Sequence, residues 1–468
     1  MSTRVRTAIV GGGWAGMAAA VAAAQAGQQV TVYEAARTLG GRARSVTLDR
    51  PHAPTLTLDN GQHILIGAYT DTLRLLRLVG IAPETALLRL PLALSFPDGS
   101  GLALPNLPAP WDAVIGIVRT RGWSVPDKIA LLRTATAWQL RGFACAPGTT
   151  VAQLCAGLTQ RLKDEFIEPL CVSALNTPAD AACGTVFLRV LKDAMFGQRG
   201  GSNLLLPRVD LGTLFPEAAA RWLAERGHRV VTGQRVQQLR PVNMTANGTA
   251  DAARWQIDDA VFDRIILATA PTEAARLVSH TAAALPRVQA SALHAWAACA
   301  GALRHEAITT VYAQVESKVA APSGTLPRPM LALRATAAHP AQFAFDRGQL
   351  GGPAGLLAFV ISASHGTREA LQARVVEQAQ VQLGLTVQPL QTITEKRATF
   401  ACTPNLERPA STLADGLQAC GDYIAGPYPA TLEGAIRSGW AAGPLGKQSD
   451  ALPHQRTKVF LRRRKYAS

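Results

Sequence analysis

A glycine turn near the start of the chain constrains the fold more than any other feature. Residues 7–10 form a short apolar run, Gly11-Gly12-Gly13-Trp14-Ala15-Gly16 follows, and residues 17–26 read as a helix. Residues 29–33 then read as a second strand, which Glu34 ends. A strand, a G-x-G-x-x-G turn, a helix and a second strand in this order predict a βαβ unit that binds a dinucleotide.

The residues of this turn have separate roles in such a unit. Gly11 permits the tight turn, Gly13 lets the backbone approach a pyrophosphate, and Gly16 lets the helix pack closely on the strand. Amide groups at the helix start, near Ala15, would face the phosphates. Glu34 would accept a hydrogen bond from the adenosine ribose and repel a 2′-phosphate, so NADP is disfavoured. The alternative is a glycine-rich turn of an unrelated α/β protein with a solvated Glu34.

Two distant segments make that alternative weaker. Gly40-Gly41-Arg42-Ala43-Arg44-Ser45 follows Glu34 closely, and residues 417–422 read as a late strand that ends in Gly421-Asp422. Residues 431–439 then begin a helix. In these segments the chain resembles the flavin amine oxidase and phytoene desaturase superfamily.

The resemblance implies one tightly held, noncovalent FAD. Arg42 and its loop would contact the pyrophosphate, which suits a fixed, bidentate cation, and Asp422 would accept a ribityl hydroxyl. The helix start at Thr431 would face the N1–C2=O edge of the flavin and stabilise negative charge there. The backbone of Val236 would meet adenine, with a core valine as the alternative reading. The implied positions beyond the first turn are Glu34, Gly41, Arg42, Val236, Gly421, Asp422, Thr431 and Leu432.

Within the superfamily the chain looks most like the hydroxysqualene dehydroxylases. The segments that carry this closer resemblance are Leu58-Asp59-Asn60-Gly61-Gln62-His63, Leu175-Asn176-Thr177-Pro178, Leu206-Pro207-Arg208-Val209-Asp210-Leu211 and Tyr428-Pro429-Ala430-Thr431. The resemblance implies reductive removal of the allylic hydroxyl of hydroxysqualene to give squalene, in hopanoid or triterpene synthesis. This needs acid-assisted loss of water and hydride from reduced FAD. A phytoene-type desaturase and, less favoured, a flavin amine oxidase are the alternative activities.

Three residues are candidates for the acid. Asp59 and His63 follow the first cofactor segments, and burial can tune a carboxyl or an imidazole toward neutrality; Tyr428 is the third. Their alternative roles are structural: a turn cap for Asp59, a core histidine for His63 and ring packing for Tyr428. No ligand spacing in the sequence argues for a metal.

The predicted fold class is α/β, with a Rossmann-like FAD-binding domain and an inserted α+β substrate domain. The cofactor domain would be discontinuous, over residues 1–70, 200–275 and 391–446, and the substrate domain would take residues 71–199 and 276–390. Apolar spacing predicts helices over 70–79, 128–140, 151–175 and 367–383, and strands over 310–315 and 356–361. Residues 447–468 would be a basic, flexible tail.

Charge and cysteine content bear on partners and location. The 468 residues hold 47 Lys and Arg against 32 Asp and Glu, a net charge of +15, and the tail has seven bases against one acid. With a hydrophobic isoprenoid substrate, we expect this tail to attach the protein peripherally to an anionic membrane, with a nucleic-acid-binding arm as the disfavoured alternative. Seven cysteines without a C-x-x-C pair favour a reducing cytoplasm, so the expected place is the inner face of a bacterial membrane. The electron donor is not identified, because no second nicotinamide motif is evident.

Overall fold

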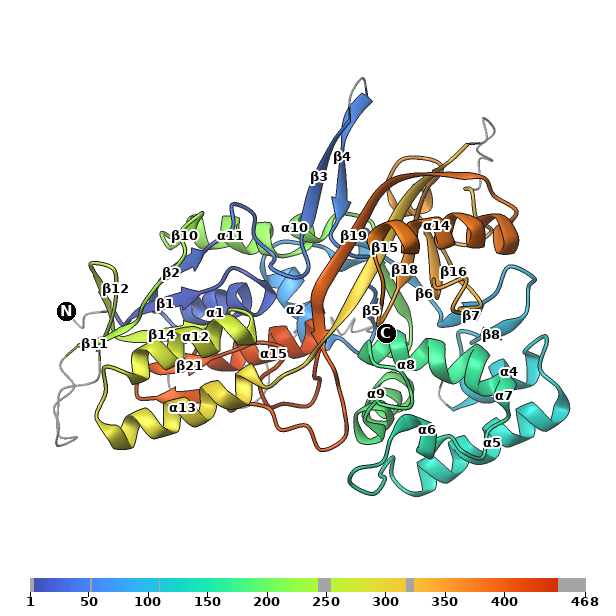
Figure 1. Ribbon diagram of the computed structural model, residues 1–468, viewed down its shortest axis with the longest axis horizontal. Coiled ribbons are helices and arrows are strands. Elements are labelled where there is room, and N and C mark those ends of the chain that lie inside the picture. Colours follow the sequence, from blue (N-terminus) through green and yellow to red (C-terminus); the bar gives the residue numbers. More distant parts are fainter. Residues whose placement is uncertain (1–3, 51–52, 109, 243–253, 317–323, 445–468) are drawn as a thin grey trace, which may run out of the picture.

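A six-stranded sheet built from both ends and the middle of the chain organises one end of the protein (Figure 1). The computed structural model describes residues 4–50, 53–108, 110–242, 254–316 and 324–444. Each neighbouring pair in the sheet is parallel except the last. The strand order is β10 (Arg229–Thr232), β2 (Gln29–Glu34), β1 (Arg6–Val10), β14 (Arg264–Leu267), β21 (Leu417–Ala419) and β20 (Thr412–Ala414).

Helices cover both faces of this sheet because its central strands are apolar on both sides. In β1, Ile9 packs into one core, whereas Ala8 and Val10 pack into another. The first core contains α1 (Trp14–Gln25), α2 (Thr70–Leu78), α10 (Leu211–Leu214), α11 (Pro216–Ala224) and α15 (Leu432–Ala442). The second contains α12 (Pro271–Ala282), α13 (Arg287–Gly301) and the strands β12 (Arg254–Ile257) and β13 (Ala260–Phe262). Strand β11 (Arg240–Val242) pairs with β12 and completes a three-stranded ribbon.

The first and last helices of the cofactor region pack against each other through small residues. A Cβ atom on Gly439 of α15 would lie 2.0 Å from the carbonyl oxygen of Ala15 in α1. A Cβ atom on Gly443 would lie 2.4 Å from the Cβ atom of Ala22. Only glycine permits this approach, which packs the second half of α15 directly against α1.

A second, antiparallel sheet forms the other large layer. Its order is β16 (Met330–Ala332), β17 (Phe343–Asp346), β18 (Leu356–Ile361), β15 (His305–Val315) and β19 (Val387–Phe400). The side chains of β18 alternate between two cores, with Ala358 and Val360 on one face and Phe359 and Ile361 on the other. The latter face is covered by α14 (Arg368–Gln378) and a π-helical turn (Ala379–Leu383), and a 3-10 turn (Arg347–Leu350) follows β17.

A helical region packs on the opposite face of that sheet. Residues 151–175 were expected to be helical, but Thr150 and Thr159 each cap a new helix start, so the stretch is divided into short pieces. The elements are α4 (Trp111–Arg119), α5 (Val125–Leu140), α6 (Val151–Leu154), α7 (Gln160–Leu162), a π-helical turn (Lys163–Ile167), α8 (Glu168–Leu175) and α9 (Gly184–Phe196).

Short strands join the two halves. In β9 (Leu204–Pro207), Leu204 and Leu206 enter the core of the helical region, whereas Leu205 enters the core of α1. This strand lies between β5 (Leu65–Ile66) and β6 (Leu87–Leu90). The remaining elements are α3 (Pro83–Ala86) and two hairpins, β3 (Ser45–Arg50) with β4 (Ala53–Asp59) and β7 (Ala93–Ser95) with β8 (Gly101–Ala103).

The packing differs from three of the predicted domain boundaries. Helix α2 lies in the core of α1, and α13 lies in a core of the six-stranded sheet, although residues 71–199 and 276–390 were assigned to the substrate domain. Strand β19 pairs with β15 in the second sheet, although residues 391–400 were assigned to the cofactor domain. Apolar periodicity marks a buried face without saying which core it enters, so we propose boundaries that follow these contacts. The predicted tail at 447–468 lies outside the described residues.

Candidate active site

One cavity of about 460 Å³ runs from the glycine turn into the second sheet. Its polar end is lined by the turn after β1, the end of β2, the loop before β3 and the segments that follow β14 and β21. Its other end is lined by α8, β15, β17 and β18. A ligand of two chemically different parts would fit such a cavity, with its polar part on the six-stranded sheet.

The glycine turn has the geometry that a phosphate-binding turn requires. Gly11 has a φ of +115°, and a Cβ atom on it would lie 2.5 Å from the carbonyl oxygen of Ala268. A Cβ atom on Gly16 would lie 1.9 Å from the carbonyl oxygen of Gly11. Gly13 is the N-cap residue of α1, and no side chain caps this helix start. The first amide groups of α1 are therefore available to an anion. Gly11, Gly13 and Ala15 all line the cavity.

Glu34 lies at the carboxyl end of β2 and also lines the cavity. One carboxylate oxygen, Oε2, accepts a hydrogen bond from the amide of Gly12 at 2.6 Å, and Oε1 accepts one from Ala36 at 2.7 Å. These bonds fix the carboxylate against the turn. Each oxygen keeps a lone pair for a further donor, as a ribose hydroxyl would be.

Arg42 and Asp422 form a bidentate ion pair at the cavity. Arg42 Nη1 lies 3.1 Å from Asp422 Oδ2, Nη2 contacts Oδ1, and Nη1 also donates to the carbonyl oxygen of Ala398 at 3.0 Å. Burial disfavours the Arg42 cation, but the Asp422 carboxylate outweighs it and holds the pKa of Arg42 above its ordinary value. Gly41 and Gly421 line the cavity beside this pair.

The start of α15 faces the same cavity. Thr431 is its N-cap, with Oγ1 accepting a hydrogen bond from the amide of Gly434 at 2.9 Å. Thr431 and Leu432 both line the cavity, as does Val236. Val236 is buried but lies outside any strand, in the segment after β10.

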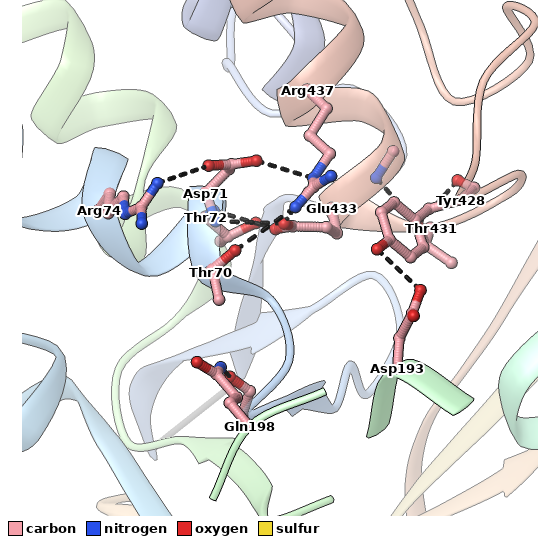
Figure 2. A network of polar contacts seen from close by, with 12 residues as sticks. Thr70, Asp71, Thr72, Arg74, Asp193, Gln198, Tyr428, Thr431, Glu433 and Arg437 are labelled. Atoms are coloured by element: carbon pink, nitrogen blue, oxygen red, sulfur yellow. Dashed lines mark hydrogen bonds and ion pairs between the residues drawn. The ribbon is translucent and has the colours of Figure 1, made fainter. Parts of the chain in front are cut away.

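A buried carboxylate holds the helix start in place, as Figure 2 shows. Glu433 accepts hydrogen bonds from the amides of Asp71 and Thr72, at 3.1 and 3.0 Å, and so caps α2 from α15. Arg437 neutralises it, with Nε 2.9 Å from Glu433 Oε1 and 2.8 Å from Asp71 Oδ2. The network therefore fixes α15 relative to α2, and with it the cavity-lining Tyr69 that precedes α2.

Of the three candidate acids, the structure brings only His63 to the cavity. Its Nδ1 lies 2.9 Å from the carbonyl oxygen of Gly61, so Nδ1 carries a proton and Nε2 is the free ring nitrogen. Burial lowers the pKa of His63 below its ordinary value, and the charge of Arg42 adds to this effect. The hydrogen bond to Gly61 opposes it only in part.

Asp59 and Tyr428 have other contacts. Asp59 Oδ1 accepts a hydrogen bond from the amide of Leu211 at 2.8 Å, at the start of α10, and burial raises the pKa of Asp59 to about 6. Tyr428 donates to Asp193 Oδ2 at 2.9 Å (Figure 2), and its ring lies against Arg437. Neither is among the described residues that line the cavity. The structure thus favours the structural readings of both residues.

Three buried polar atoms at the cavity were not singled out from the sequence. Tyr423 OH, Thr269 Oγ1 and Gln62 Nε2 have no hydrogen-bond partner among the described residues. Unpaired buried polar groups cost free energy unless a ligand satisfies them. Gln62 lies within the segment at residues 58–63, and Tyr423 directly follows Gly421-Asp422, so both could have been found from their neighbouring motifs. No comparable signal marked Thr269.

Two further findings apply to the described ranges. They contain no group of three or more His, Cys, Asp and Glu side chains that could hold a metal ion. In the same ranges no helix has both the length and the apolar character to cross a membrane.

The fold combines a glycine turn and helix start suited to cofactor phosphates with a second, largely apolar compartment in the same cavity. The chain belongs to the family described as flavin containing amine oxidoreductase, whose sequence pattern matches residues 14–442. It is therefore a flavin-dependent oxidoreductase. Membership of this family confirms the predicted fold class, an α/β cofactor domain with an inserted substrate domain.

Named relatives match nearly the full chain. A hydroxysqualene dehydroxylase of Zymomonas mobilis is 26% identical over 461 residues, which cover 94% of this chain and 98% of that protein. One of Rhodopseudomonas palustris is 27% identical and covers 93% and 97%. Among solved structures, an oxidoreductase from Methanosarcina mazei has a TM-score of 0.66 at 16% identity, over 93% of this chain and 99% of that one. The two relatives agree with the resemblance found from the sequence.

Proposed function

We propose that this flavoenzyme uses FAD to remove the hydroxyl group of hydroxysqualene and so forms squalene. The observation that carries the proposal is one continuous cavity that joins a polar end suited to a dinucleotide to an apolar compartment. The named relatives support the choice of substrate, since they match this chain over nearly its whole length.

The polar end fits FAD. Glu34 is fixed where an adenosine ribose would donate to it, and the amides at the start of α1 suit a pyrophosphate. Thr431 begins α15 at the same cavity, where the partial positive charge of a helix start would favour electron density on a flavin ring. When bound in reduced form, FAD would supply the hydride that replaces the hydroxyl.

The apolar end suits a substrate made of hydrocarbon. Its lining includes Leu175, Ile308, Phe343, Phe345 and Val360. Loss of an allylic hydroxyl leaves a carbocation, which water would capture, so the compartment must exclude water around the reacting carbon. Aliphatic and aromatic side chains without polar groups perform that task.

His63 is the proposed proton donor to the departing hydroxyl. With Nδ1 held by Gly61, a protonated ring would donate from Nε2, and water would leave with that proton. Because the pKa of His63 is lowered, the donating form is populated at acidic pH. The other two candidates lack a place on the cavity lining.

Product analysis tests the proposal. Purified holoprotein is reduced anaerobically with light, mixed with hydroxysqualene, extracted with hexane and analysed by mass spectrometry. Squalene should form in proportion to reduced protein, and flavin-free protein treated identically is the control. Denaturing a separate sample should release FAD into the supernatant. Holoprotein that yields no squalene, but converts phytoene when oxidised, would instead indicate a desaturase.

A further inference from the structure

Two helices at one end of the molecule carry large apolar side chains on their outer surface. Trp111 of α4 is 62% exposed, and Val125 and Leu140 of α5 are 68% and 83% exposed. We call this the α4–α5 surface, and it consists of Leu107, Trp111, Val118, Val125, Ile129 and Leu140. In Figure 1 α4 and α5 lie with α7 at the end of the protein away from the six-stranded sheet.

Leu107 precedes α4, and the other five side chains share one face of each helix. Val125, Ile129 and Leu140 are separated by four and eleven residues, which brings them to the same side of α5. Trp111 and Val118, seven residues apart, do the same on α4. Lys128 Nζ donates to the carbonyl oxygen of Val118 at 2.8 Å, so the end of α4 lies beside the start of α5.

The opposite faces of the two helices hold them on the protein. Ile117 of α4 and Leu131 and Trp138 of α5 are buried in the core of the helical region. The same core includes Leu175, which lines the apolar compartment. The outward apolar residues are therefore not needed for this packing. They lie on the helical region, which also forms one wall of the cavity.

The exposed charges that α4, α5 and the segments beside them contribute have one sign. Residues 105–141 contain the exposed Arg119, Arg121, Arg133 and Arg141 and the half-buried Lys128. The two acids of this stretch, Asp112 and Asp127, are buried. Asp127 is held in the cap of α5 by Ser124 and accepts from Thr159 at 2.6 Å.

We propose that the α4–α5 surface docks the protein on an anionic lipid bilayer. Exposed aliphatic residues, a tryptophan and surrounding bases are the features by which a helix lies in the headgroup region. The inference rests on the proposed function in one respect, since a triterpene substrate must be collected from lipid. A second copy of the chain is a poorer occupant, because two such surfaces facing each other would bring like charges together.

Vesicle sedimentation of full-length protein tests the docking. The main variant is Trp111→Gln/Val125→Gln/Ile129→Gln, whose positions are exposed, and the matched control is Val381→Gln, which is equally exposed on the turn after α14. A second pair is Arg119→Gln/Arg133→Gln with Arg374→Gln as control, all on exposed positions. Vesicles contain phosphatidylcholine with or without phosphatidylglycerol.

The triple variant should bind phosphatidylglycerol vesicles at least about tenfold more weakly than wild type, with Val381→Gln unchanged. Each arginine removed should weaken binding roughly fivefold, only when phosphatidylglycerol is present. Wild-type binding by the triple variant would overturn the proposal, and so would a dimer in wild type that the triple variant loses while vesicle binding persists.

An activity assay in detergent micelles separates this inference from the proposed function. All variants should dehydroxylate micellar hydroxysqualene at the wild-type rate, since none touches the cavity. If no protein forms squalene, the proposed function fails while sedimentation still decides the docking. If vesicle binding is lost together with micellar activity and folding by circular dichroism, the residues are structural and the docking proposal is overturned.

Discussion

Arg42 and Asp422, 380 positions apart in the chain, form a bidentate ion pair on the cavity wall. Arg42 comes from the loop after β2, and Asp422 lies three residues after the end of β21. The two were expected to contact different parts of FAD. Their contact joins the first and last segments of the cofactor region at the point where both meet the cavity.

Breaking this pair should weaken FAD binding. Arg42→Lys loses the planar, two-pronged donor, and Asp422→Asn leaves Arg42 without its charge partner. Because Arg42 is partly exposed, we expect a moderate effect of about 1–2 kcal/mol, near tenfold in Kd. Titration of apoprotein with FAD, followed by flavin fluorescence, measures it. Arg334→Lys, which alters a surface pair with Asp98, is the matched control and should bind as wild type.

Glu34→Ala should also weaken FAD binding. The substitution removes the acceptor of the Gly12 and Ala36 amides and the expected acceptor of the ribose hydroxyl. Loss of hydrogen bonds to a charged group costs about 1.5–3 kcal/mol, or roughly 10- to 100-fold in Kd. Glu84→Ala, an exposed glutamate paired with Arg77, is the control. Equal Kd values for the two variants would remove Glu34 from the site.

His63→Ala should keep FAD and lose turnover. Loss of a general acid slows a reaction about 10²–10⁴-fold. Because the pKa of His63 is lowered, kcat/KM of wild type should rise as pH falls through neutrality and level off below the ordinary histidine value. The variant should have a flat profile, and added imidazole should restore part of the rate. A wild-type rate in His63→Ala would assign the residue a structural role.

Asp59→Asn should change stability rather than catalysis. Burial raises the pKa of Asp59 to about 6, above its ordinary value of 3.8, so the stability tied to its protonated form is present below pH 4 and is lost as pH rises through 6. That change amounts to roughly 3 kcal/mol at most. Asparagine keeps an acceptor for the Leu211 amide but does not ionise. In urea unfolding, the free energy of unfolding of the variant should therefore rise relative to that of wild type between pH 4 and 7. Turnover below a tenth of wild type would return Asp59 to the catalytic candidates.

The basic tail remains a separate prediction. Replacing Arg462, Arg463, Arg464 and Lys465 by glutamine in the full-length chain removes four of its bases. If the tail attaches the protein, vesicle binding should fall by roughly fivefold per base engaged. If the tail variant sediments with vesicles as wild type does, the tail has no part in attachment, and the α4–α5 surface alone remains as the proposed membrane contact.

Local patterns predicted the cofactor end of the molecule well. The strand, glycine turn and helix occupy consecutive residues, and each residue type is required by backbone geometry, as the positive φ of Gly11 shows. Thr431 was identified as a helix start for a similar reason, because a threonine side chain caps the amide three residues on.

The chemistry of the site was harder to predict because it depends on which way a side chain points. Asp59 and His63 lie four residues apart, yet only His63 lines the cavity, while Asp59 binds the start of α10. Thr269 and Tyr69 reach the cavity from other elements, and no local pattern connects them to it. The packing of α13 on the core of the six-stranded sheet, although residues 276–390 were assigned to the substrate domain, was unpredictable for the same reason, since its partners are distant in sequence.

The direction of electron transfer tests the central claim most directly. Anaerobic holoprotein is reduced with light, and its absorbance is followed after mixing with hydroxysqualene; oxidised holoprotein is mixed with phytoene in parallel. We predict that hydroxysqualene restores the absorbance of oxidised flavin in the first mixture and that phytoene leaves the second unchanged. Bleaching by phytoene, or a reduced flavin that hydroxysqualene does not reoxidise, would contradict the account.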